Sequence, residues 1–125
     1  MDFVKNKYNI CVVGLGYVGL PLLNRFSKKG YATTGFDINE LRVNELRDSI
    51  DSNNDIDIND LQNISLKSQI TSNIEDIKDC NVFIITVPTP INEDKTPDLA
   101  PIISATKLIG KIIKSGSIVI YESTV

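Results

Sequence analysis

The glycine spacing G-x-G-x-x-G constrains the fold of this chain more than any other feature. It occurs in GLGYVG, residues 14–19, directly after the apolar run YNICVV and before the mixed run LPLLNRFSKKG. In this spacing the first glycine allows a tight turn, the second lets phosphates approach the backbone, and the third lets a helix pack against a strand. The pattern alone is weak evidence, but in this position it predicts a strand, a turn and a helix that bind a dinucleotide.

The rest of the chain continues this alternation. Runs that are apolar or β-branched and bounded by turn residues predict strands at residues 8–13, 31–37, 67–71, 81–87 and 117–122. Strands that alternate with helices favour right-handed crossovers and a parallel sheet. We therefore expect one Rossmann-type α/β domain over residues 1–125, a doubly wound sheet of about five strands in the order 3-2-1-4-5, truncated before a sixth.

The predicted helices follow from capping residues and apolar periodicity. The first runs from the glycine turn to Lys28 and Lys29, and a single helical turn is expected at 74–78. The second begins at the cap Asn39 and has an apolar side made of Leu41, Val43, Leu46 and Ile50. The last begins at the cap Asp98, ends at Gly116, and has apolar residues at Leu99, Ile102, Ile103, Ile109, Ile112 and Ile113.

The acidic stretch at 48–60, DSIDSNNDIDIND, has the composition of either a calcium loop or a solvated connection. A calcium loop starting at Asp55 needs glycine where Asp60 stands and a bidentate glutamate where Leu66 stands. The stretch is therefore interpreted as a solvated connection.

Composition excludes several function classes. The net charge of -3 disfavours a nucleic-acid or anionic-membrane partner. The chain has no histidine, and its cysteines, Cys11 and Cys80, stand apart without CxxC spacing, so we expect no metal site and two structural thiols in a reducing cytoplasm. Glycines and a proline interrupt the apolar stretch at 10–23, which therefore fits neither a signal peptide nor a membrane span.

An acidic residue at the end of the second strand points to the cofactor. Asp37 stands 18 residues after Gly19, where a carboxylate can accept hydrogen bonds from the adenosine ribose hydroxyls. A 2′-phosphate would be repelled there, which favours NAD over NADP. Arg42 either lies against the adenine or ribose or is a surface arginine with no ligand role, and in principle it could receive a 2′-phosphate.

The loops after the first, fourth and fifth strands should meet at the topological switch point, where ligands bind. In the second of these loops, Val87 and Pro88 lead to Thr89, whose hydroxyl is expected to face a nicotinamide ribose. The loop ESTV should line the same crevice through Thr124. The alternative for Thr89 and Thr124 is that their hydroxyls only cap turns.

Several separated motifs together resemble the UDP-glucose/GDP-mannose dehydrogenase family: VVGLGYVGLPL, GFDINELRV, FIITVPTPI, TPDLAPI and IVIYESTV, in the family's order and over essentially the whole chain. The residues of VPTPI and YESTV most resemble those of the branch that acts on UDP-N-acetylhexosamines. The resemblance implies oxidation of C6 of the sugar from alcohol to carboxylate with two NAD, for capsule or O-antigen polysaccharides.

The resemblance also implies roles for single residues. It places Thr124 near the reacting carbon, as a catalytic-site residue that helps hold a water or an oxyanion. It implies that the family's nucleophilic cysteine and its oxyanion-stabilising lysine lie beyond residue 125, and that neither Cys11 nor Cys80 is that nucleophile. Combining the resemblance with the loop positions, we expect the cofactor to be contacted by Gly14, Leu15, Gly16, Tyr17, Val18, Gly19, Asp37, Arg42, Val87, Pro88 and Thr89.

Family members are longer, so we expect a fragment that lacks the linker helices and the UDP-sugar domain. Such a chain should bind NAD(H) without oxidising UDP-sugars, and the full-length protein is expected to be a homo-oligomer. Two alternatives fit the glycines: a stand-alone NAD-sensing Rossmann domain that regulates potassium transport, and another C6-type or hydroxyacid dehydrogenase. Neither explains the later motifs VPTPI, PDL and YESTV together.

Overall fold

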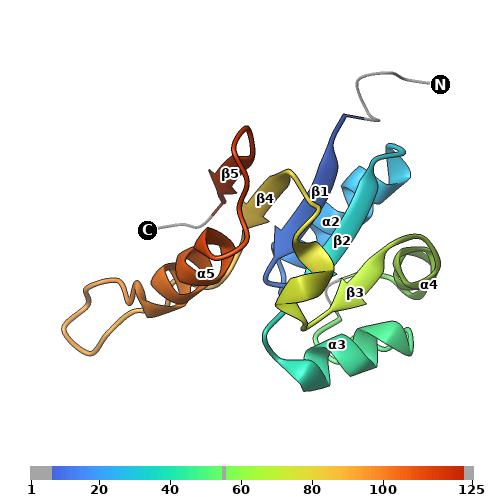
Figure 1. Ribbon diagram of the computed structural model, residues 1–125. Coiled ribbons are helices and arrows are strands. Elements are labelled where there is room, and N and C mark those ends of the chain that lie inside the picture. The colour runs from blue at the N-terminus through green and yellow to red at the C-terminus, as the bar shows by residue number, and fades with distance from the viewer. Residues whose placement is uncertain (1–6, 55, 123–125) are drawn as a thin grey trace.

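The computed structural model describes residues 7–54 and 56–122, which form a single parallel sheet flanked by helices (Figure 1). The strand order β3-β2-β1-β4-β5 confirms the predicted order 3-2-1-4-5. The strands are β1 (Asn9–Val13), β2 (Ala32–Phe36), β3 (Gln69–Thr71), β4 (Val82–Ile85) and β5 (Ile118–Tyr121). Each neighbouring pair is parallel, so the carboxyl ends of all five strands lie at the same edge of the sheet.

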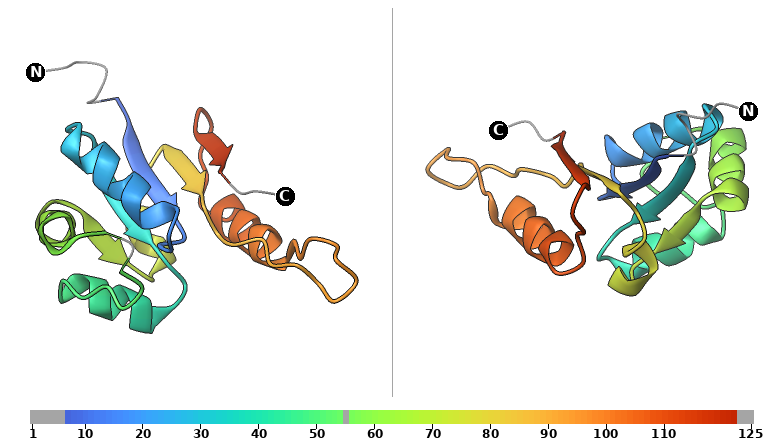
Figure 2. Two further views of the ribbon diagram at one scale, coloured as in Figure 1. Left: turned by 180° about the vertical axis from the view of Figure 1, so that it is seen from behind. Right: turned by 45° about the horizontal axis from the view of Figure 1, so that its top comes forward.

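The helices cover the sheet unequally. They are α2 (Gly19–Lys28), α3 (Glu40–Arg47), α4 (Ile58–Lys67), η1 (Ile74–Ile77) and α5 (Ala100–Gly110). In Figures 1 and 2, α5 lies beside β4 and β5, at the opposite end of the sheet from α3 and α4. None of the helices in the described ranges combines the length and apolar character that a bilayer crossing needs.

Helix α4 corrects the prediction of a solvated connection followed by a strand from residue 67. Asp57 caps it by accepting a hydrogen bond from the Asp60 N–H at 2.9 Å, and the helix buries Leu61 and Ile64. Two apolar residues three positions apart are enough to hold one helical turn against the core, and the acidic composition upstream obscured them. Strand β3 is correspondingly short.

Helices α3 and α5 differ in detail from their expected apolar sides. In α3, Val43 and Leu46 are buried, whereas Leu41 lies on the exposed side of the helix. Ile50 is also exposed and lies beyond the end of the helix at Arg47. The predicted cap Asn39 is confirmed, and its side chain accepts from two backbone N–H groups. Helix α5 buries Ile109 but leaves Leu99, Ile103 and Ile113 exposed. Asp98 lies just before the N-cap Leu99 and accepts from the Ala100 N–H at 2.9 Å.

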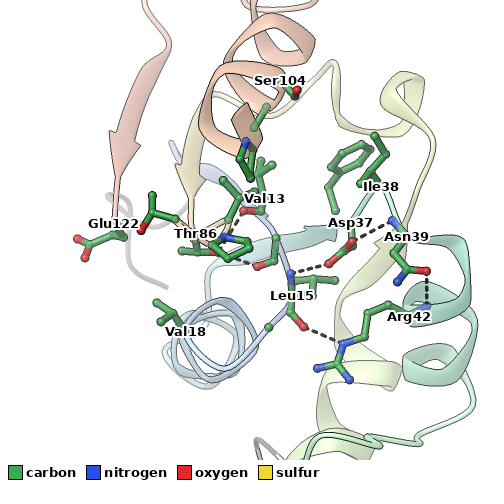
Figure 3. A pocket seen from close by; sticks show the side chains of 18 of the residues that line it. Val13, Leu15, Val18, Asp37, Ile38, Asn39, Arg42, Thr86, Ser104 and Glu122 are labelled. Carbon is green, nitrogen blue, oxygen red and sulfur yellow. Dashed lines mark hydrogen bonds between the residues drawn. The ribbon is translucent and has the colours of Figure 1, made fainter. Parts of the chain in front are cut away.

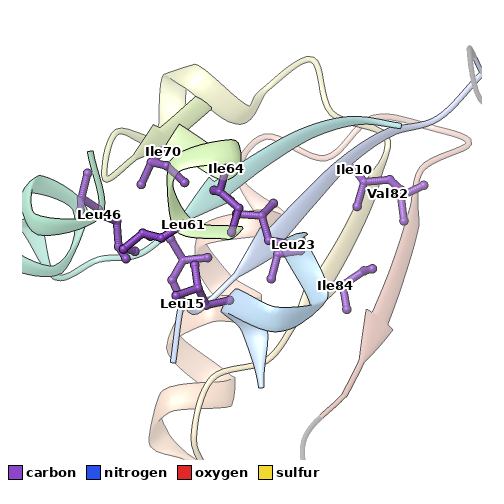
Figure 4. Packing of buried hydrophobic residues seen from close by; sticks show 12 residues of the cluster. Ile10, Leu15, Leu23, Leu46, Leu61, Ile64, Ile70, Val82 and Ile84 are labelled. Atoms are coloured by element: carbon purple, nitrogen blue, oxygen red, sulfur yellow. The ribbon is translucent and has the colours of Figure 1, made fainter. Parts of the chain in front are cut away.

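Two hydrophobic clusters lie on the two faces of the sheet. The first joins α2, α3 and α4 to the strands through residues that include Ile10, Leu15, Leu23, Leu46, Leu61, Ile64, Ile70, Val82 and Ile84 (Figure 4). The second joins η1 and α5 to the opposite face, around Cys11, Val13, Phe36, Ile77, Phe83, Ile85 and Ile109. Alternate residues of β1 and β4 therefore serve different cores, as a parallel sheet covered on both faces requires.

The two cysteines are not apart, as the sequence suggested, but belong to the same cluster. Cys11 and Cys80 are both buried free thiols. The hydrogen bond between them raises the pKa of Cys11, and burial raises it further. The same hydrogen bond lowers the pKa of Cys80, an effect that a hydrogen bond with Thr34 reinforces.

Candidate functional site

A pocket of about 840 Å³ opens at the carboxyl edge of the sheet. The residues that directly follow four of the strands line it: Gly14 after β1, Asp37 after β2, Thr86 after β4 and Glu122 after β5. The pocket thus lies at the switch point between β1 and β4, where doubly wound folds bind ligands, and its volume is within the range of small-molecule sites.

Most of the sequence-predicted cofactor residues line this pocket. They are Gly14, Leu15, Gly16, Tyr17, Val18, Asp37, Arg42, Val87, Pro88 and Thr89. Gly19 lies behind the turn and does not line it. Thr124, the predicted catalytic-site residue, lies outside the described residues. Sequence reasoning did not identify Ser104, Pro101 or Asn53, which also line the pocket.

The three glycines of the turn have separate structural reasons. Gly14 has a φ of 99°, a left-handed value that favours glycine. A Cβ atom at Gly19 would lie 1.8 Å from the Gly14 carbonyl oxygen, so only glycine lets α2 start against the turn. At Gly16, by contrast, a Cβ atom would meet nothing within 4 Å. The protein itself does not require glycine there, which leaves open space for a ligand against the backbone.

The amino end of α2 adds favourable electrostatics. Its first turn carries no acidic side chain, and Val18 at its N-cap makes no side-chain capping bond. The positive end of the helix dipole therefore faces the pocket wall, which suits a phosphate.

Thr86 supports the turn from the neighbouring strand and was not identified from the sequence. Its hydroxyl lies 2.6 Å from the Gly14 carbonyl oxygen and 3.1 Å from that of Val13 (Figure 3). These contacts tie the end of β4 to the first glycine. The only available signal was a threonine closing a β-branched run, which also fits plain strand propensity.

Asp37 links the pocket to both sides of its strand end. Its Oδ2 accepts from the Leu15 N–H at 2.9 Å, and its Oδ1 accepts from the Asn39 N–H at 2.9 Å (Figure 3). An ionised carboxylate has further lone pairs on each oxygen. The side chain is therefore held in place and can still accept hydroxyl hydrogen bonds from the pocket.

Arg42 is not the surface arginine that one interpretation of the sequence expected, because only 8% of the residue is exposed. Its Nε donates to the Leu15 carbonyl oxygen at 2.8 Å, and its Nη1 donates to Glu45 Oε1 at 2.7 Å and Asp51 Oδ1 at 2.8 Å. Burial alone would lower the pKa of Arg42, but the hydrogen bonds to Asp51 and Glu45 outweigh it and raise the pKa. Asp51, placed by the sequence in a solvated connection, has a side chain only 3% exposed.

The described lining of the pocket carries hydroxyl and carboxylate side chains but no thiol or amine. Among the described lining residues there is no cysteine and no lysine. Both cysteines are buried in the second cluster instead. The arrangement fits a site that binds a phosphate at the glycine turn and a hydroxyl at Asp37.

Comparisons with known proteins agree with this geometry. A model of the UDP-glucose/GDP-mannose dehydrogenase family, NAD binding domain, matches residues 8–125. The chain is 55% identical over 116 residues to the UDP-N-acetyl-D-glucosamine 6-dehydrogenase of Pseudomonas aeruginosa, covering 93% of this chain and 27% of that protein. It is 48% identical over 117 residues to Protein CapL of Staphylococcus aureus, covering 94% of this chain and 27% of that protein.

Solved structures show the same fold. The UDP-N-acetyl-mannosamine dehydrogenase Cap5O from Staphylococcus aureus superposes with a TM-score of 0.81 at 32% identity, over 93% of this chain and 28% of that one. A UDP-glucose dehydrogenase from the archaeon Pyrobaculum islandicum gives a TM-score of 0.82 at 26% identity, over 94% and 29%. The chain thus spans less than a third of the length of these relatives. None of these matches supports the potassium-transport alternative.

Proposed function

Because this chain belongs to the UDP-glucose/GDP-mannose dehydrogenase family, of which it matches the NAD-binding domain, we propose that it holds NAD in a protein that oxidises C6 of a UDP-N-acetylhexosamine. The names of the relatives support this substrate class, since they act on UDP-N-acetyl-D-glucosamine and UDP-N-acetyl-D-mannosamine. A role in capsule or O-antigen synthesis, which the resemblance to the family implies, is part of the same proposal. The observation that carries the binding role is the glycine turn, whose second glycine has open space beside it.

The described residues suit the parts of NAD in order. The pyrophosphate would lie at Gly16 and the amino end of α2, where backbone N–H groups and the helix dipole favour negative charge. Asp37 would accept hydrogen bonds from the adenosine ribose hydroxyls, and the segment from Val87 to Thr89 would contact the nicotinamide ribose. When bound, NAD supplies the hydride acceptor, and conversion of an alcohol to a carboxylate needs two such transfers.

The reaction itself requires more than this pocket. The described lining holds no cysteine to attack the C6 aldehyde, so we propose that the 125-residue chain binds NAD(H) and does not turn over the UDP-sugar. Thr124 is proposed to face the reacting carbon, and a homo-oligomer is proposed for the full-length protein. The buried thiols, which oxidation would disturb, support a reducing cytoplasmic setting.

Replacement of Gly16 by valine tests the binding role without disturbing the fold. Gly16 is not among the positive-φ glycines, and a Cβ atom there meets no neighbour within 4 Å, so G16V should fold normally. The new side chain would occupy the space of the phosphates, and we expect NADH binding, measured by calorimetry, to weaken by at least about tenfold.

Gly110, on α5, provides the matched control, because a Cβ atom there also meets nothing within 4 Å. G110V should bind NADH as the unchanged chain does. Undiminished NADH binding by a folded G16V would contradict the proposed function. Turnover of UDP-N-acetylglucosamine with NAD by the purified chain would contradict the claim that it is inactive alone.

A further inference from the structure

A buried ion-pair network lies behind the adenosine end of the pocket. Arg42 of α3 meets two carboxylates, from Glu45 one turn later on the same helix and from Asp51 in the segment that follows. The pair with Asp51 is the more buried of the two, since the side chains of Arg42 and Asp51 are 8% and 3% exposed, whereas that of Glu45 is 24% exposed. The Glu45 carboxylate also accepts hydrogen bonds from the Ser52 hydroxyl at 3.0 and 3.1 Å.

Backbone N–H groups hold the Asp51 carboxylate in place, so its position does not depend on Arg42 alone. The Asn53 N–H donates to Asp51 Oδ1 at 3.2 Å, and the Ile56 N–H donates to Asp51 Oδ2 at 3.2 Å. A carboxylate that is anchored in this way fixes the position of the guanidinium it binds.

The network ends at the ligand side of the pocket. Arg42 Nε donates to the carbonyl of Leu15, and the N–H of Leu15 donates to the Asp37 carboxylate (Figure 3). Arg42, Asn53 and Asp37 all line the pocket. Arg42 is therefore paired with the carboxylates of Glu45 and Asp51 and is linked through the Leu15 backbone to Asp37, close to where the adenosine ribose would bind.

We propose that Asp51 determines the choice between NAD and NADP by holding Arg42 against the glycine turn. The proposal rests on the proposed function. A guanidinium is a good bidentate partner for phosphate, and an arginine near this ribose is the group that would receive a 2′-phosphate. Here three of its five N–H donors are directed to Leu15, Glu45 and Asp51, and the two paired carboxylates disfavour a dianion beside it. Asp51 is a positioning residue that acts through Arg42 and does not touch the cofactor.

A purely structural role for Asp51 makes a different prediction. Loss of packing or of the loop would weaken the binding of both dinucleotides by the same factor. Loss of the arginine's anchor and of one negative charge would weaken NADH binding slightly and improve NADPH binding. The ratio of the two dissociation constants separates these roles, and neither affinity alone does so.

The experiment measures the dissociation constants of NADH and NADPH by calorimetry on the chain and on D51N, E45Q and D79N. Asp79 is the matched control, because it pairs with Lys114 at the surface and its side chain is 78% exposed. In D51N we expect the preference for NADH over NADPH to fall by about tenfold, as removal of one nearby charge predicts. E45Q should shift it in the same direction by a smaller factor, about threefold, because Glu45 is more exposed. D79N should leave it unchanged.

An unchanged preference in a folded D51N, or equal weakening of both ligands, would overturn the inference while leaving the proposed function intact. Should D51N fail to fold in circular dichroism, E45Q decides, and an unchanged preference there overturns the inference. An unaltered chain that binds neither dinucleotide would overturn the proposed function and this inference together.

Discussion

Strands β1 and β5 belong to the same parallel sheet but have opposite surroundings. In β1 the residues from Ile10 to Val13 are all buried, with a strand on each side and helices on both faces. In β5 no residue is buried, β4 is its only neighbour among the described strands, and Ile118 and Ile120 are exposed. Both strands end at the pocket, and within the described residues β1 contributes four buried residues to the core whereas β5 contributes the half-buried Val119.

The side-chain alternation of β5 explains where its exposure lies. Val119 is paired with Phe83 of the second cluster and is half-buried beneath α5. Ile118 and Ile120 are paired with Val82 and Ile84 of the first cluster, on the face that α2 covers at the centre of the sheet. The central strands therefore carry the stability of the pocket, and the edge strand depends on one helix.

The largest expected effect comes from adding one methyl group at the glycine turn. Gly19→Ala places a Cβ atom 1.8 Å from the Gly14 carbonyl oxygen and 2.5 Å from the Thr86 hydroxyl, so the start of α2 must move. We expect the free energy of unfolding in urea to fall by about 4 kcal/mol or more.

Gly110→Ala makes the same chemical change near the edge of the sheet, where the added atom meets nothing within 4 Å. Its unfolding free energy should stay within about 0.5 kcal/mol of that of the unchanged chain. Similar losses in the two variants would show that the centre and the edge are equally constrained, contrary to the comparison.

A smaller effect distinguishes two valines at the centres of their strands. Val12→Ala in β1 removes a fully buried side chain at 0% exposure and should cost about 2–3 kcal/mol of unfolding free energy. Val119→Ala in β5 should cost about 1 kcal/mol, because the side chain is only half-buried. The two unfolding curves measured in urea under one set of conditions provide the check, and a Val119 loss equal to that at Val12 would contradict the difference between the strands.

The smallest effect concerns acid. The hydrogen bond from Arg42 lowers the pKa of Glu45 in the folded chain, and hydrogen bonds with Ser52 lower it further against the opposing effect of burial. A lowered folded pKa means that this stabilisation is fully present above the unfolded pKa of Glu45 and is lost as the pH falls through the folded value.

The unfolding free energy of the unchanged chain should therefore fall more between pH 7 and pH 3 than that of Glu45→Gln. The difference will be small because Glu45 is partly exposed. If both proteins lose the same amount of unfolding free energy, the ionised Glu45 carboxylate does not stabilise the folded chain. Glu75→Gln is the control, since the Glu75 side chain is 68% exposed. Its unfolding free energy should fall between pH 7 and pH 3 by the same amount as that of the unchanged chain.

The sequence predicted the sheet order and ten of the residues that line the pocket, because both depend on local patterns. Three local patterns carry these predictions: a glycine spacing, β-branched runs and one acidic residue at the end of a strand. Each can be recognised within a short stretch of the sequence. Helix α4 was missed because only Leu61 and Ile64 mark its buried side within an acidic context. The pairs formed by Arg42 with Asp51 and by Cys11 with Cys80 could not be predicted, because they join side chains whose proximity depends on the folded loops.

The two hydrogen bonds made by the backbone of Leu15 also affect the thermodynamics of ligand binding. With its N–H bonded to Asp37 and its carbonyl bonded to Arg42, this residue is held in one conformation by contacts within the protein. The entropy of ordering this segment is lost during folding and does not have to be lost again on association. The turn is thus preorganised, and a dinucleotide that binds there does not lose affinity to the ordering of this segment.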